Sequence, residues 1–356
     1  MTRYSGRCFA SPFPDRIVHH LLFNYLSPML EPLLVYDSYS CRLGKGTLEG
    51  IQRCGHHIRS CSENWSRPAY ALQLDIQGYF MSIVKQRLYD ILWHDIDSRR
   101  RARHPILQLP WKDCVDYEFI DFLIRSVLMR DPVQDCLIIG DLSDWDGFPA
   151  NKSLRLSHTP DVGLPIGDLT SQLFSNIYMN PLDQYIKRKL RCRHYGRYVD
   201  DAYIIHTDPR YLEMLVPYIE EFLGEHLGLR LHPRKIRITP VDQGIQFLGA
   251  VIKPFRTYVS NRTVRSFHRK MYHWEQICAR RHLMDKEVDL LVQVINSYTG
   301  YFAHFKCFRI LQKQFVQSPI LRYVLFSRGF GKAEPKDRSQ RIIPFENDPL
   351  LFGTWE

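Results

Sequence analysis

The spacing of apolar side chains in the first part of the chain predicts helices that alternate with a strand. One helix is predicted over residues 14–30 and a second over residues 47–60, with an irregular basic stretch at residues 39–46 between them. The short apolar run at residues 71–76 is typical of a buried strand, and a carboxylate lies near its end. A third helix is predicted over residues 84–95.

A less regular stretch follows at residues 98–161, where tryptophans are mixed with several Pro and Gly residues. We expect this stretch to be an insertion. The next helix is expected to begin near Thr170 and Ser171, whose hydroxyls can cap free backbone amides. It should extend to about residue 190, with a bend at Pro181.

Two short apolar runs, at residues 195–199 and 202–205, flank the pair Asp200-Asp201. This arrangement is typical of a β-hairpin, so the two acids are expected at its tip.

The C-terminal part of the chain is predicted to be mostly helical. A cap residue followed by proline at the first helical position predicts a helix over residues 209–227. Strands are expected around residues 236–238 and 245–252, and residues 262–316 have a helical and basic pattern. From about residue 318 the chain is Pro-rich and irregular.

Composition limits the class of protein. The chain has 356 residues, 45% of them hydrophobic, which is enough for a sizeable core with subdomains. No run reaches the roughly 18 apolar residues that span a bilayer. Residues 1–16 are polar and mixed, so no signal peptide is expected, and a cytoplasmic protein of bacterial or phage origin fits. The net charge of +10 favours a polyanionic partner.

The nine cysteines are odd in number and scattered without a CxxC pair, so a disulfide framework is not expected. One group, Cys54, His56, His57 and Cys61, falls within a predicted helix. It is either a zinc site or a helix with two buried thiols, and the lack of paired metal-binding knuckles favours the thiols.

Three carboxylates are candidates for catalysis. Asp75 ends a predicted strand, and Asp200 and Asp201 lie at the predicted hairpin tip. An acidic hairpin tip is either a solvated turn, where Asp is common, or a functional site. Two adjacent carboxylates repel each other, so their placement side by side is costly. Their apolar flanks place these acids at the edge of a core. Two Mg²⁺ ions about 4 Å apart would offset the repulsion and could support phosphoryl transfer.

Five segments, in order along the chain, resemble motifs A to E of the reverse transcriptases. The segments are residues 74–83 for motif A, residues 163–172 for motif B, Tyr198-Val199-Asp200-Asp201 for motif C, Lys235 for motif D, and the primer-grip run Phe247-Leu248-Gly249 for motif E.

The resemblance implies an α+β fold of the right-hand polymerase type, with fingers, palm and thumb. Residues 1–70 would form truncated fingers. Residues 71–255 would form the palm, with an RRM-like antiparallel sheet and the insertion at residues 98–161. Residues 256–320 would form a helical thumb, followed by a C-terminal extension at residues 321–356. The implied activity is an RNA-directed DNA polymerase that uses template RNA, a DNA or RNA primer and deoxynucleoside triphosphates.

The form of motif B resembles that of diversity-generating retroelement enzymes. Ile166-Gly167 and Ser171-Gln172 stand where many reverse transcriptases have Gln-Gly and Ser-Pro, and the run at residues 297–301 also resembles the thumb of that group. This resemblance implies a template-repeat RNA, error-prone copying at template adenines and a small basic accessory protein that forms a pentamer. Retron, group II intron and phage-defence enzymes remain alternatives.

The resemblance also implies roles at the catalytic centre. Asp75 and Asp200 would bind two Mg²⁺ ions, for which Mn²⁺ could substitute, with the Ile76 carbonyl as a further ligand. Asp201 would be the weaker ligand. Lys235 would protonate or shield pyrophosphate, unless it is an ordinary surface lysine.

Other residues are expected beside the nucleotide. Phe80 would exclude a ribose 2′-hydroxyl, unless it is a core aromatic, and Tyr79 is expected in the core. Ile166, Gly167 and Gln172 would lie under the nascent base pair. An apolar Ile166 would remove a hydrogen-bonding group there and weaken base selection, while Gly167 permits close backbone approach.

Two arginines resemble fingers residues that bind the triphosphate or template. Arg7 and Arg42 would do so because guanidinium suits bidentate phosphate contact, and the alternative is that both are surface charges. Relatives carry several dozen residues before the Arg7 position. A non-catalytic relic with incomplete fingers is therefore a further alternative.

The predicted thumb combines basic and aromatic residues. A basic helical face would follow the template–primer backbone through its A-form shape, and an aromatic stripe would lie in the core on the opposite face. The basic residues are Arg262, Arg265, Arg269, Lys270, Arg280 and Arg281, and the aromatic ones are Phe267, Tyr272 and Trp274.

Overall fold

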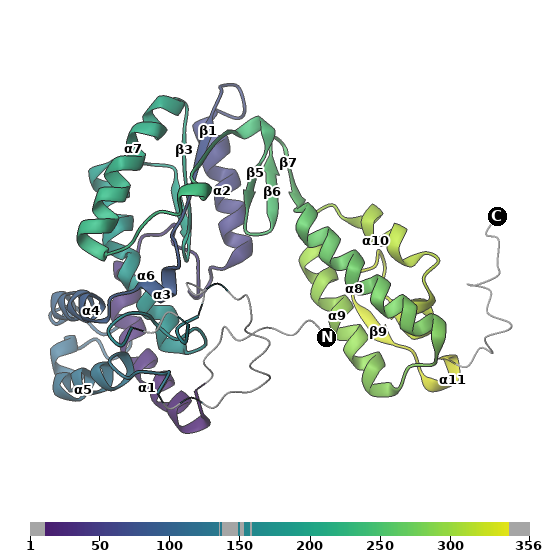
Figure 1. Ribbon diagram of the computed structural model, residues 1–356, viewed down its shortest axis with the longest axis horizontal. Coiled ribbons are helices and arrows are strands. Elements are labelled where there is room, and N and C mark those ends of the chain that lie inside the picture. Colours follow the sequence, from purple (N-terminus) through teal and green to yellow (C-terminus); the bar gives the residue numbers. More distant parts are fainter. Residues whose placement is uncertain (1–10, 135, 137–148, 150–152, 157–158, 342–356) are drawn as a thin grey trace. The chain divides into compact units, whose positions relative to one another are not determined.

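Two units make up the chain in this computed structural model, Met1–Val241 and Asp242–Glu356 (Figure 1). The structure describes residues 11–341 except residues 135, 137–148, 150–152 and 157–158. Over that part of the chain, none of the helices has both the length and the apolar character needed to cross a membrane.

A four-stranded antiparallel sheet forms the centre of the first unit. Its strands are β1 (Tyr70–Asp75), β2 (Tyr195–Tyr198), β3 (Asp201–His206) and β4 (Arg237–Pro240). They lie in the order β2-β3-β1-β4, so the predicted strand at residues 71–76 and both arms of the predicted hairpin are confirmed. The register pairs Tyr70 with His206 at one end of β1 and Asp75 with Asp201 at the other. This pairing sets the end of β1 against the beginning of the hairpin's second arm.

Helices cover both faces of this sheet. The main helices of the unit are α1 (Phe13–Leu30), α2 (Thr47–Cys61), α4 (Lys85–Arg99), α5 (Tyr117–Leu128), α6 (Leu169–Gln184) and α7 (Pro209–Phe222). Alternate residues of a strand point to opposite faces. Accordingly, Tyr203 of β3 reaches His57 of α2, while its neighbour Ile204 joins the core that contains Leu212 of α7. The sheet therefore lies between α2 and α7 (Figure 1).

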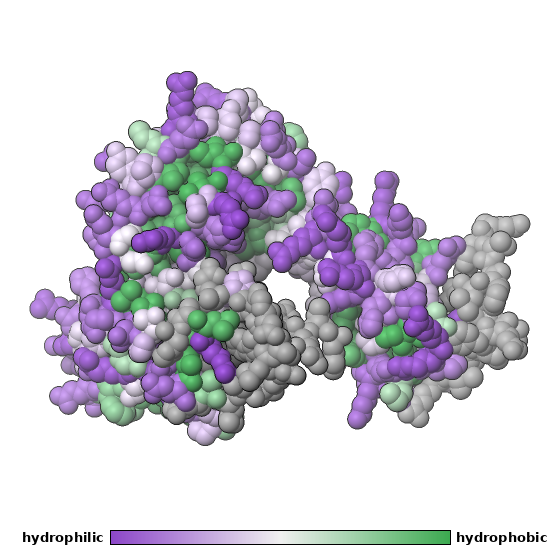
Figure 2. Space-filling view, viewed as in Figure 1, coloured by the Kyte–Doolittle hydropathy of each residue, from purple (hydrophilic) through white to green (hydrophobic). Residues whose placement is uncertain are grey.

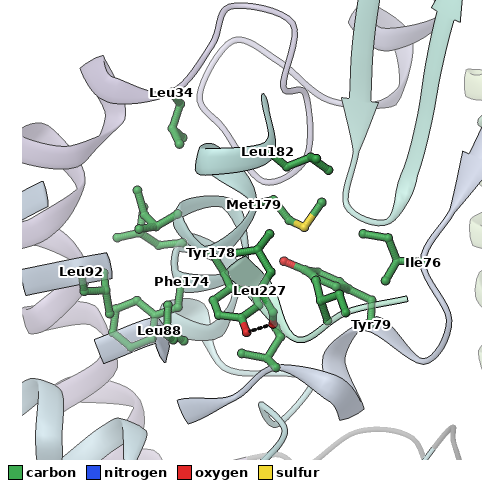
Figure 3. Packing of buried hydrophobic residues seen from close by; sticks show 14 of the residues in the cluster. Leu34, Ile76, Tyr79, Leu88, Leu92, Phe174, Tyr178, Met179, Leu182 and Leu227 are labelled. Carbon is green, nitrogen blue, oxygen red and sulfur yellow. Dashed lines mark hydrogen bonds between the residues drawn. The ribbon is translucent and has the colours of Figure 1, made fainter. Parts of the chain in front are cut away.

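The largest core surrounds α6, which packs against α1 and α4. Figure 3 shows Phe174, Tyr178 and Met179 of α6 among residues of neighbouring elements. The Tyr178 hydroxyl donates a hydrogen bond to the Leu227 carbonyl, which satisfies its polar atom inside this core (Figure 3). Each large apolar side chain buried here contributes roughly 1.5–3 kcal/mol. This core fixes the position of α6 beneath the ends of the strands.

The beginning of α6 differs from the prediction in one detail. The helix begins at Leu169 rather than being capped by Thr170 and Ser171, because the buried Thr170 hydroxyl hydrogen-bonds to Nδ1 of His19 at 2.7 Å instead. As predicted, helical structure extends to about residue 190: α6 continues through Pro181 and then changes to a π-helical turn at Tyr185–Lys189. A similar π-helical turn, Leu223–Leu227, extends α7 and completes the predicted helix over residues 209–227.

The predicted irregular insertion contains a regular helix, α5. The Asp116 carboxylate caps it by accepting the backbone amides of Glu118 and Phe119. Its buried face comprises Ile120, Leu123, Ile124 and Leu128. The prediction missed this amphipathic helix because its surroundings are rich in turn-forming residues. Short helices complete the unit: α3 (Tyr79–Ser82), η1 (Glu31–Leu33), η2 (Trp111–Asp113), η7 (Pro233–Lys235) and η8 (Val241–Gln243), which continues into the second unit.

The second unit begins with a small sheet and continues into helices. The sheet has the order β5-β6-β7, with β5 (Ile245–Phe247), β6 (Ala250–Lys253) and β7 (Arg256–Val259). The single strand expected at residues 245–252 is therefore a hairpin. The helices are α8 (Asn261–Arg280), α9 (Asp285–Phe302) and α10 (Phe308–Phe315), which confirm the helical prediction for this region.

The C-terminal stretch, expected to be irregular, contains further regular elements. They are η9 (Pro319–Arg322), β8 (Val324–Phe326), β9 (Ala333–Pro335) and the short helix α11 (Arg338–Arg341). Strands β8 and β9 pair as an antiparallel ribbon, and the side chain of Asn296 on α9 bonds the backbone of Ala333 on β9. The ribbon is thus attached to the helices of the same unit.

Candidate active site

Three carboxylates meet where β1 ends and the β2–β3 hairpin turns. Asp75 is the last residue of β1, and it pairs with Asp201, the first residue of β3. Tyr198 pairs with Asp201 across the hairpin, so Val199 and Asp200 form a two-residue loop. Strand pairing alone therefore brings Asp200 and Asp201 to Asp75.

The electrostatics of this cluster are unfavourable without a cation. Burial raises the pKa of Asp200, and the Asp75 carboxylate adds to the increase. Desolvation, with the charges of Asp200 and Asp75, raises the pKa of Asp201 to about 7. The Asp201 residue is solvent-exposed, so burial alone does not account for its raised pKa. The negative charges of Asp200 and Asp75 are the cause that remains at an exposed position. Excess negative charge is the defining property of the cluster.

Lys235 is the cation that lies beside these acids. Its Nζ donates to Oδ2 of Asp75 at 2.6 Å, although its side chain is 51% exposed. The backbone delivers it there, because the His232 amide donates to the Asp75 carbonyl at 2.8 Å and Ile76 bridges to Leu231. The backbone hydrogen bonds that hold this bridge are donated by the His232 amide to the Asp75 carbonyl and by the Gln77 amide to the Arg230 carbonyl. The Ile76 carbonyl takes no part in them.

The donor set fits a divalent metal ion of the Mg²⁺ type. No group of three or more His, Cys, Asp or Glu side chains is already arranged around one metal position in the described ranges. Mg²⁺, however, is usually bound by one or two carboxylates together with substrate phosphates, rather than by an all-protein cage. Three neighbouring carboxylates, with a raised pKa at Asp200 and Asp201 and with one exposed edge, match that type of site.

The hairpin turn itself is strained. Val199 has a φ of 55°, in the left-handed region. This conformation costs an L-residue roughly 1–2 kcal/mol, and it is rare for a β-branched side chain. Such residues are held in place by their surroundings and gather at functional sites. The turn that carries Asp200 therefore depends on other contacts.

A buried ion pair beneath the turn was missed by sequence reasoning. Arg197 of β2 and Asp183 of α6 are both fully buried, with Nε to Oδ1 at 2.8 Å and Nη2 to Oδ2 at 2.7 Å. Arg197 Nη1 also donates to the Val199 carbonyl at 2.8 Å. Burial alone would lower the pKa of Arg197, but the Asp183 carboxylate outweighs it and the pKa is raised. The signal available in the sequence was that Asp183 and Arg197 are each the only charged residue of their segment. A charged side chain that becomes buried is normally paired with an opposite charge.

The segment that resembles motif B is attached to the segment that resembles motif A. The Leu164 amide donates to the Phe80 carbonyl at 2.8 Å, and the Gly163 amide donates to the Ile83 carbonyl at 2.7 Å. Phe80 is half-buried and stacks edge-on against Tyr79, with 5.3 Å between ring centroids. Tyr79 is buried in the core, as expected, and its hydroxyl donates to the Ser175 carbonyl at 2.6 Å.

The predicted base-pair residues lie in the turn before α6 and, for Gln172, in the first turn of the helix itself. Ile166 and Gln172 are half-buried, and Gly167 is exposed with a φ of 142° that favours glycine. The next residue, Asp168, is buried and accepts a hydrogen bond from Ser11. His19 Nε2 lies 3.5 Å from the same carboxylate, so the turn is fastened to α1.

Of the two arginines predicted to act in the fingers, the structure describes Arg42. Arg42 is occupied within the fold: its Nε donates to Glu31 Oε1 at 2.8 Å, and its Nη1 donates to the carbonyls of Val35 and Ser38. Arg7 lies outside the described residues. The nucleotide contacts of both arginines stay a prediction.

The group once considered for zinc is part of α2. Cys54 is fully buried and Cys61 is half-buried. The His57 ring is buried and bonds to the Tyr203 hydroxyl at 3.0 Å. In the described part of the chain these side chains are not gathered around one metal position. The alternative of two buried thiols holds for Cys54 but not for Cys61.

In the second unit, the predicted primer-grip residues form a tight turn. Phe247 pairs with Ala250, and Leu248 and Gly249 between them have φ values of 50° and 81°. The Tyr301 hydroxyl donates to the Leu248 carbonyl at 3.2 Å, which links this turn to α9.

Helix α8 carries basic and apolar residues on different faces. Its buried positions are Phe267, Met271, Trp274 and Cys278, and the exposed ones include Arg262, Arg265, Arg269, Lys270 and Arg280. Tyr272 is 62% exposed, so its expected place in the aromatic stripe is wrong: it falls on the polar side of the helix. Arg281 forms a bidentate pair with Glu287. The visible face of this unit is largely hydrophilic (Figure 2).

Comparisons with known proteins identify the family that the chain resembles. A family model described as reverse transcriptase (RNA-dependent DNA polymerase) matches residues 9–252. No curated protein matches the chain. Among solved structures, the chain is similar to apo telomerase from Candida tropicalis truncated from its C-terminal domain, with 14% identity, a TM-score of 0.47, and coverage of 69% of this chain and 45% of that one.

A second similar structure is telomerase from Candida albicans in complex with a TWJ fragment of telomeric RNA. It shares 12% identity at a TM-score of 0.44, over 84% of this chain and 47% of that one. The chain thus spans about half the length of these solved proteins.

Proposed function

The chain belongs to the reverse transcriptase family, and from this membership we propose that it is an RNA-directed DNA polymerase that makes cDNA by nucleotidyl transfer. The observation that carries the proposal is the pairing that brings Asp75, Asp200 and Asp201 together inside the matched segment. The mixed fold with an antiparallel sheet is that of the family's polymerase domain, of the right-hand type.

In the proposed reaction, the primer 3′-hydroxyl oxygen attacks the α-phosphorus of a deoxynucleoside triphosphate, and the bond to the β-phosphate breaks. Two divalent ions, in our proposal Mg²⁺ with Mn²⁺ as a substitute, would supply charge neutralisation and activation of the hydroxyl. Asp75, Asp200 and the Ile76 carbonyl would hold them, and Asp201 would be the weaker ligand.

Lys235 would act on the leaving group. Its ammonium lies within hydrogen-bond distance of Asp75, and therefore beside the reacting phosphates in this proposal. A proton donated from Nζ to the departing pyrophosphate would neutralise the charge that bond cleavage leaves on it. General acid catalysis of this kind contributes about 10²–10⁴-fold.

Substrate selection would rest on residues around the turn before α6. We assign Phe80 as the ring that excludes a ribose 2′-hydroxyl, and Ile166, Gly167 and Gln172 as the surface beneath the nascent pair. The bonds from Leu164 and Gly163 to the Phe80 segment support this assignment, because they keep the two segments adjacent. Arg7 and Arg42 are proposed to assist near the triphosphate.

A diversity-generating retroelement is the subtype that we propose, because Ile166-Gly167 and Ser171-Gln172 have its form of motif B. The template would be a repeat-bearing RNA, and a small basic accessory protein would be a partner. Replacing Ile166 by Gln is expected to lower misincorporation opposite template adenine. An unchanged error spectrum would separate Ile166 from fidelity.

The wider assignment follows the family's organisation. We propose fingers at residues 1–70, a palm at residues 71–255, a thumb at residues 256–320 and an extension at residues 321–356. Template and primer would contact the Phe247-Leu248-Gly249 turn and the basic face of α8. That face fits a phosphate backbone because its cations are exposed.

Primer extension tests the activity. Wild-type protein with Mg²⁺, an RNA template and deoxynucleotides is expected to extend a primer, and Asp200→Ala should abolish extension. Glu213→Ala is the matched control, because Glu213 is an exposed carboxylate on α7. Extension that survives in Asp200→Ala, or that requires ribonucleotides, would contradict the proposal.

A further inference from the structure

Arg197 touches three parts of the first unit at once. Its guanidinium donates to Asp183 of α6, to the Val199 carbonyl in the hairpin turn, and through Nη2 to the Ser38 hydroxyl at 3.3 Å. We propose that Arg197, oriented by Asp183, is the positioning residue that holds the Val199–Asp200 turn in the shape that presents the carboxylates. The kinetic side of this proposal rests on the proposed polymerase function.

The bond to Val199 acts on the peptide that leads into Asp200. The Val199 carbonyl and the Asp200 amide belong to one planar peptide group. Fixing the carbonyl at 2.8 Å from Nη1 therefore fixes the plane from which the Asp200 backbone continues. Because Val199 is held in a left-handed conformation that a valine avoids, the turn would relax to another shape without this bond.

Asp183 determines where the guanidinium points. Two parallel bonds from Nε and Nη2 match the planar fork to the carboxylate, so the direction of the remaining nitrogen, Nη1, is set as well. The Tyr195 hydroxyl donates to Asp183 Oδ1 at 2.5 Å and holds that carboxylate in turn. A lysine at position 197 would keep the charge but lose this geometry.

The backbone of Arg197 is also fixed. Its amide donates to the Asp37 carbonyl, and its carbonyl accepts the Tyr39 amide, both at 2.9 Å. The arm of the hairpin cannot slide relative to this segment without breaking both bonds. A buried ion pair adds little to stability compared with apolar residues of the same size. Its contact with a strained functional turn gives Arg197 and Asp183 a role beyond packing.

Two variants and one control test the proposal. Arg197→Lys keeps the charge and removes the fork, while Asp183→Asn keeps the shape and releases the fork. Leu212→Ala, in the fully buried core under α7, lowers stability without touching the turn. Hydrogen exchange of the segment 198–202 is measured in protein without metal or substrate, at equal distance below each melting temperature. The kcat of primer extension and the KM for template–primer are measured beside it.

We expect both turn variants to raise exchange of this segment at least tenfold over Leu212→Ala. They should also lower kcat at least tenfold, with little change in KM. Exchange and kcat per folded molecule equal to those of Leu212→Ala would overturn the proposal. Failure of both variants to fold, with Leu212→Ala folded, would overturn it too, because the pair would then serve the whole fold. If the wild type extends no primer, the polymerase function fails, while the exchange data still decide the role of Arg197.

Discussion

Two groups of charged side chains in the first unit meet opposite electrostatic conditions. Asp37 is buried with cations around it: Arg53 Nε and Lys187 Nζ each lie 3.0 Å from its oxygens. Asp75, Asp200 and Asp201 instead face one another, with Lys235 at their edge. The first group is neutralised by its own fold, whereas the second leaves negative charge in excess.

The pKa values of the two groups express this difference. Burial alone would raise the pKa of Asp37, but His57, Lys187 and Arg53 outweigh it and the pKa is lowered. Burial lowers the pKa of His57 to about 3, so Lys187 and Arg53 carry the positive charge at neutral pH. The pKa values of Asp200 and Asp201 are raised. The charges around Asp37 are balanced within the protein, and this complete network stabilises the fold. The charges of Asp75, Asp200 and Asp201 are not balanced, and this incomplete network indicates where a cation and a substrate would bind.

The largest expected effect comes from removing a charge in the incomplete group. Asp75→Asn should lower primer extension on the order of 10³-fold or more, because it removes a proposed metal ligand. The melting temperature should change little, since repulsion with Asp200 and Asp201 is relieved as the bond from Lys235 weakens. Rates per folded molecule and thermal melts measure the two sides. A retained rate would remove Asp75 from the site.

The same change in the completed group should have the opposite pattern. Asp37→Asn leaves Arg53 and Lys187 without their carboxylate and should cost about 3 kcal/mol of unfolding free energy. Extension per folded molecule should stay within about threefold of the wild type, because the substitution keeps the Asp37 backbone carbonyl that Arg197 binds. Urea unfolding and primer extension decide it. A stable variant with a collapsed rate would erase the contrast between the two groups.

Lys235 tests whether the edge cation serves chemistry or stability. Lys235→Met should lower kcat roughly 10²-fold as proton donation is lost. Its half-exposed bond to Asp75 should contribute less than about 1 kcal/mol to stability. Primer extension measures the rate, and urea unfolding measures the stability. An unchanged kcat in Lys235→Met would make Lys235 an ordinary surface lysine.

The smallest effect is on the pH dependence of stability. The pKa of Asp201 is raised from 3.8 to about 7, so its contribution is present below about pH 4 and is lost as pH rises through 7. His57 has the opposite sign, since its pKa falls from 6.5 to about 3 and its contribution is lost as pH falls below 6.5.

Urea unfolding at pH 5 and pH 8, without divalent ions, measures this difference. Asp201→Asn should gain more stability relative to wild type at pH 8 than at pH 5. The gain should be a few tenths of a kcal/mol, because Asp201 is solvent-exposed and its interactions are screened. A gain that is largest at pH 5 would show that the sign is wrong.

The sequence predicted the elements whose signals are local. The hairpin with Asp200 at its tip, the strand that ends at Asp75 and the helix that starts at Pro209 each follow from a short run of residues. That Asp75, Asp200 and Asp201 act at one centre was implied only by the resemblance of the motifs. Helix α5 was missed because turn-forming neighbours outweighed its apolar spacing.

Long-range polar pairs were beyond the sequence. Nothing local joins Asp37 to Lys187, or Asp183 to Arg197, because each pair is made by the packing of separate elements. Thr170 shows the same limit: its hydroxyl bonds to His19 across the core instead of capping its own helix. Local pattern identified the acids, while the contacts that position them required the fold.

The most direct test of the central contrast is metal binding itself. Mn²⁺ binding, followed by electron paramagnetic resonance with template–primer and a deoxynucleotide, would be compared in wild type, Asp200→Asn and Asp37→Asn. We predict that Asp200→Asn weakens Mn²⁺ binding at least tenfold, while Asp37→Asn binds as the wild type does. Equal Mn²⁺ binding by the wild type and Asp200→Asn would contradict the assignment of the three carboxylates as the cation site.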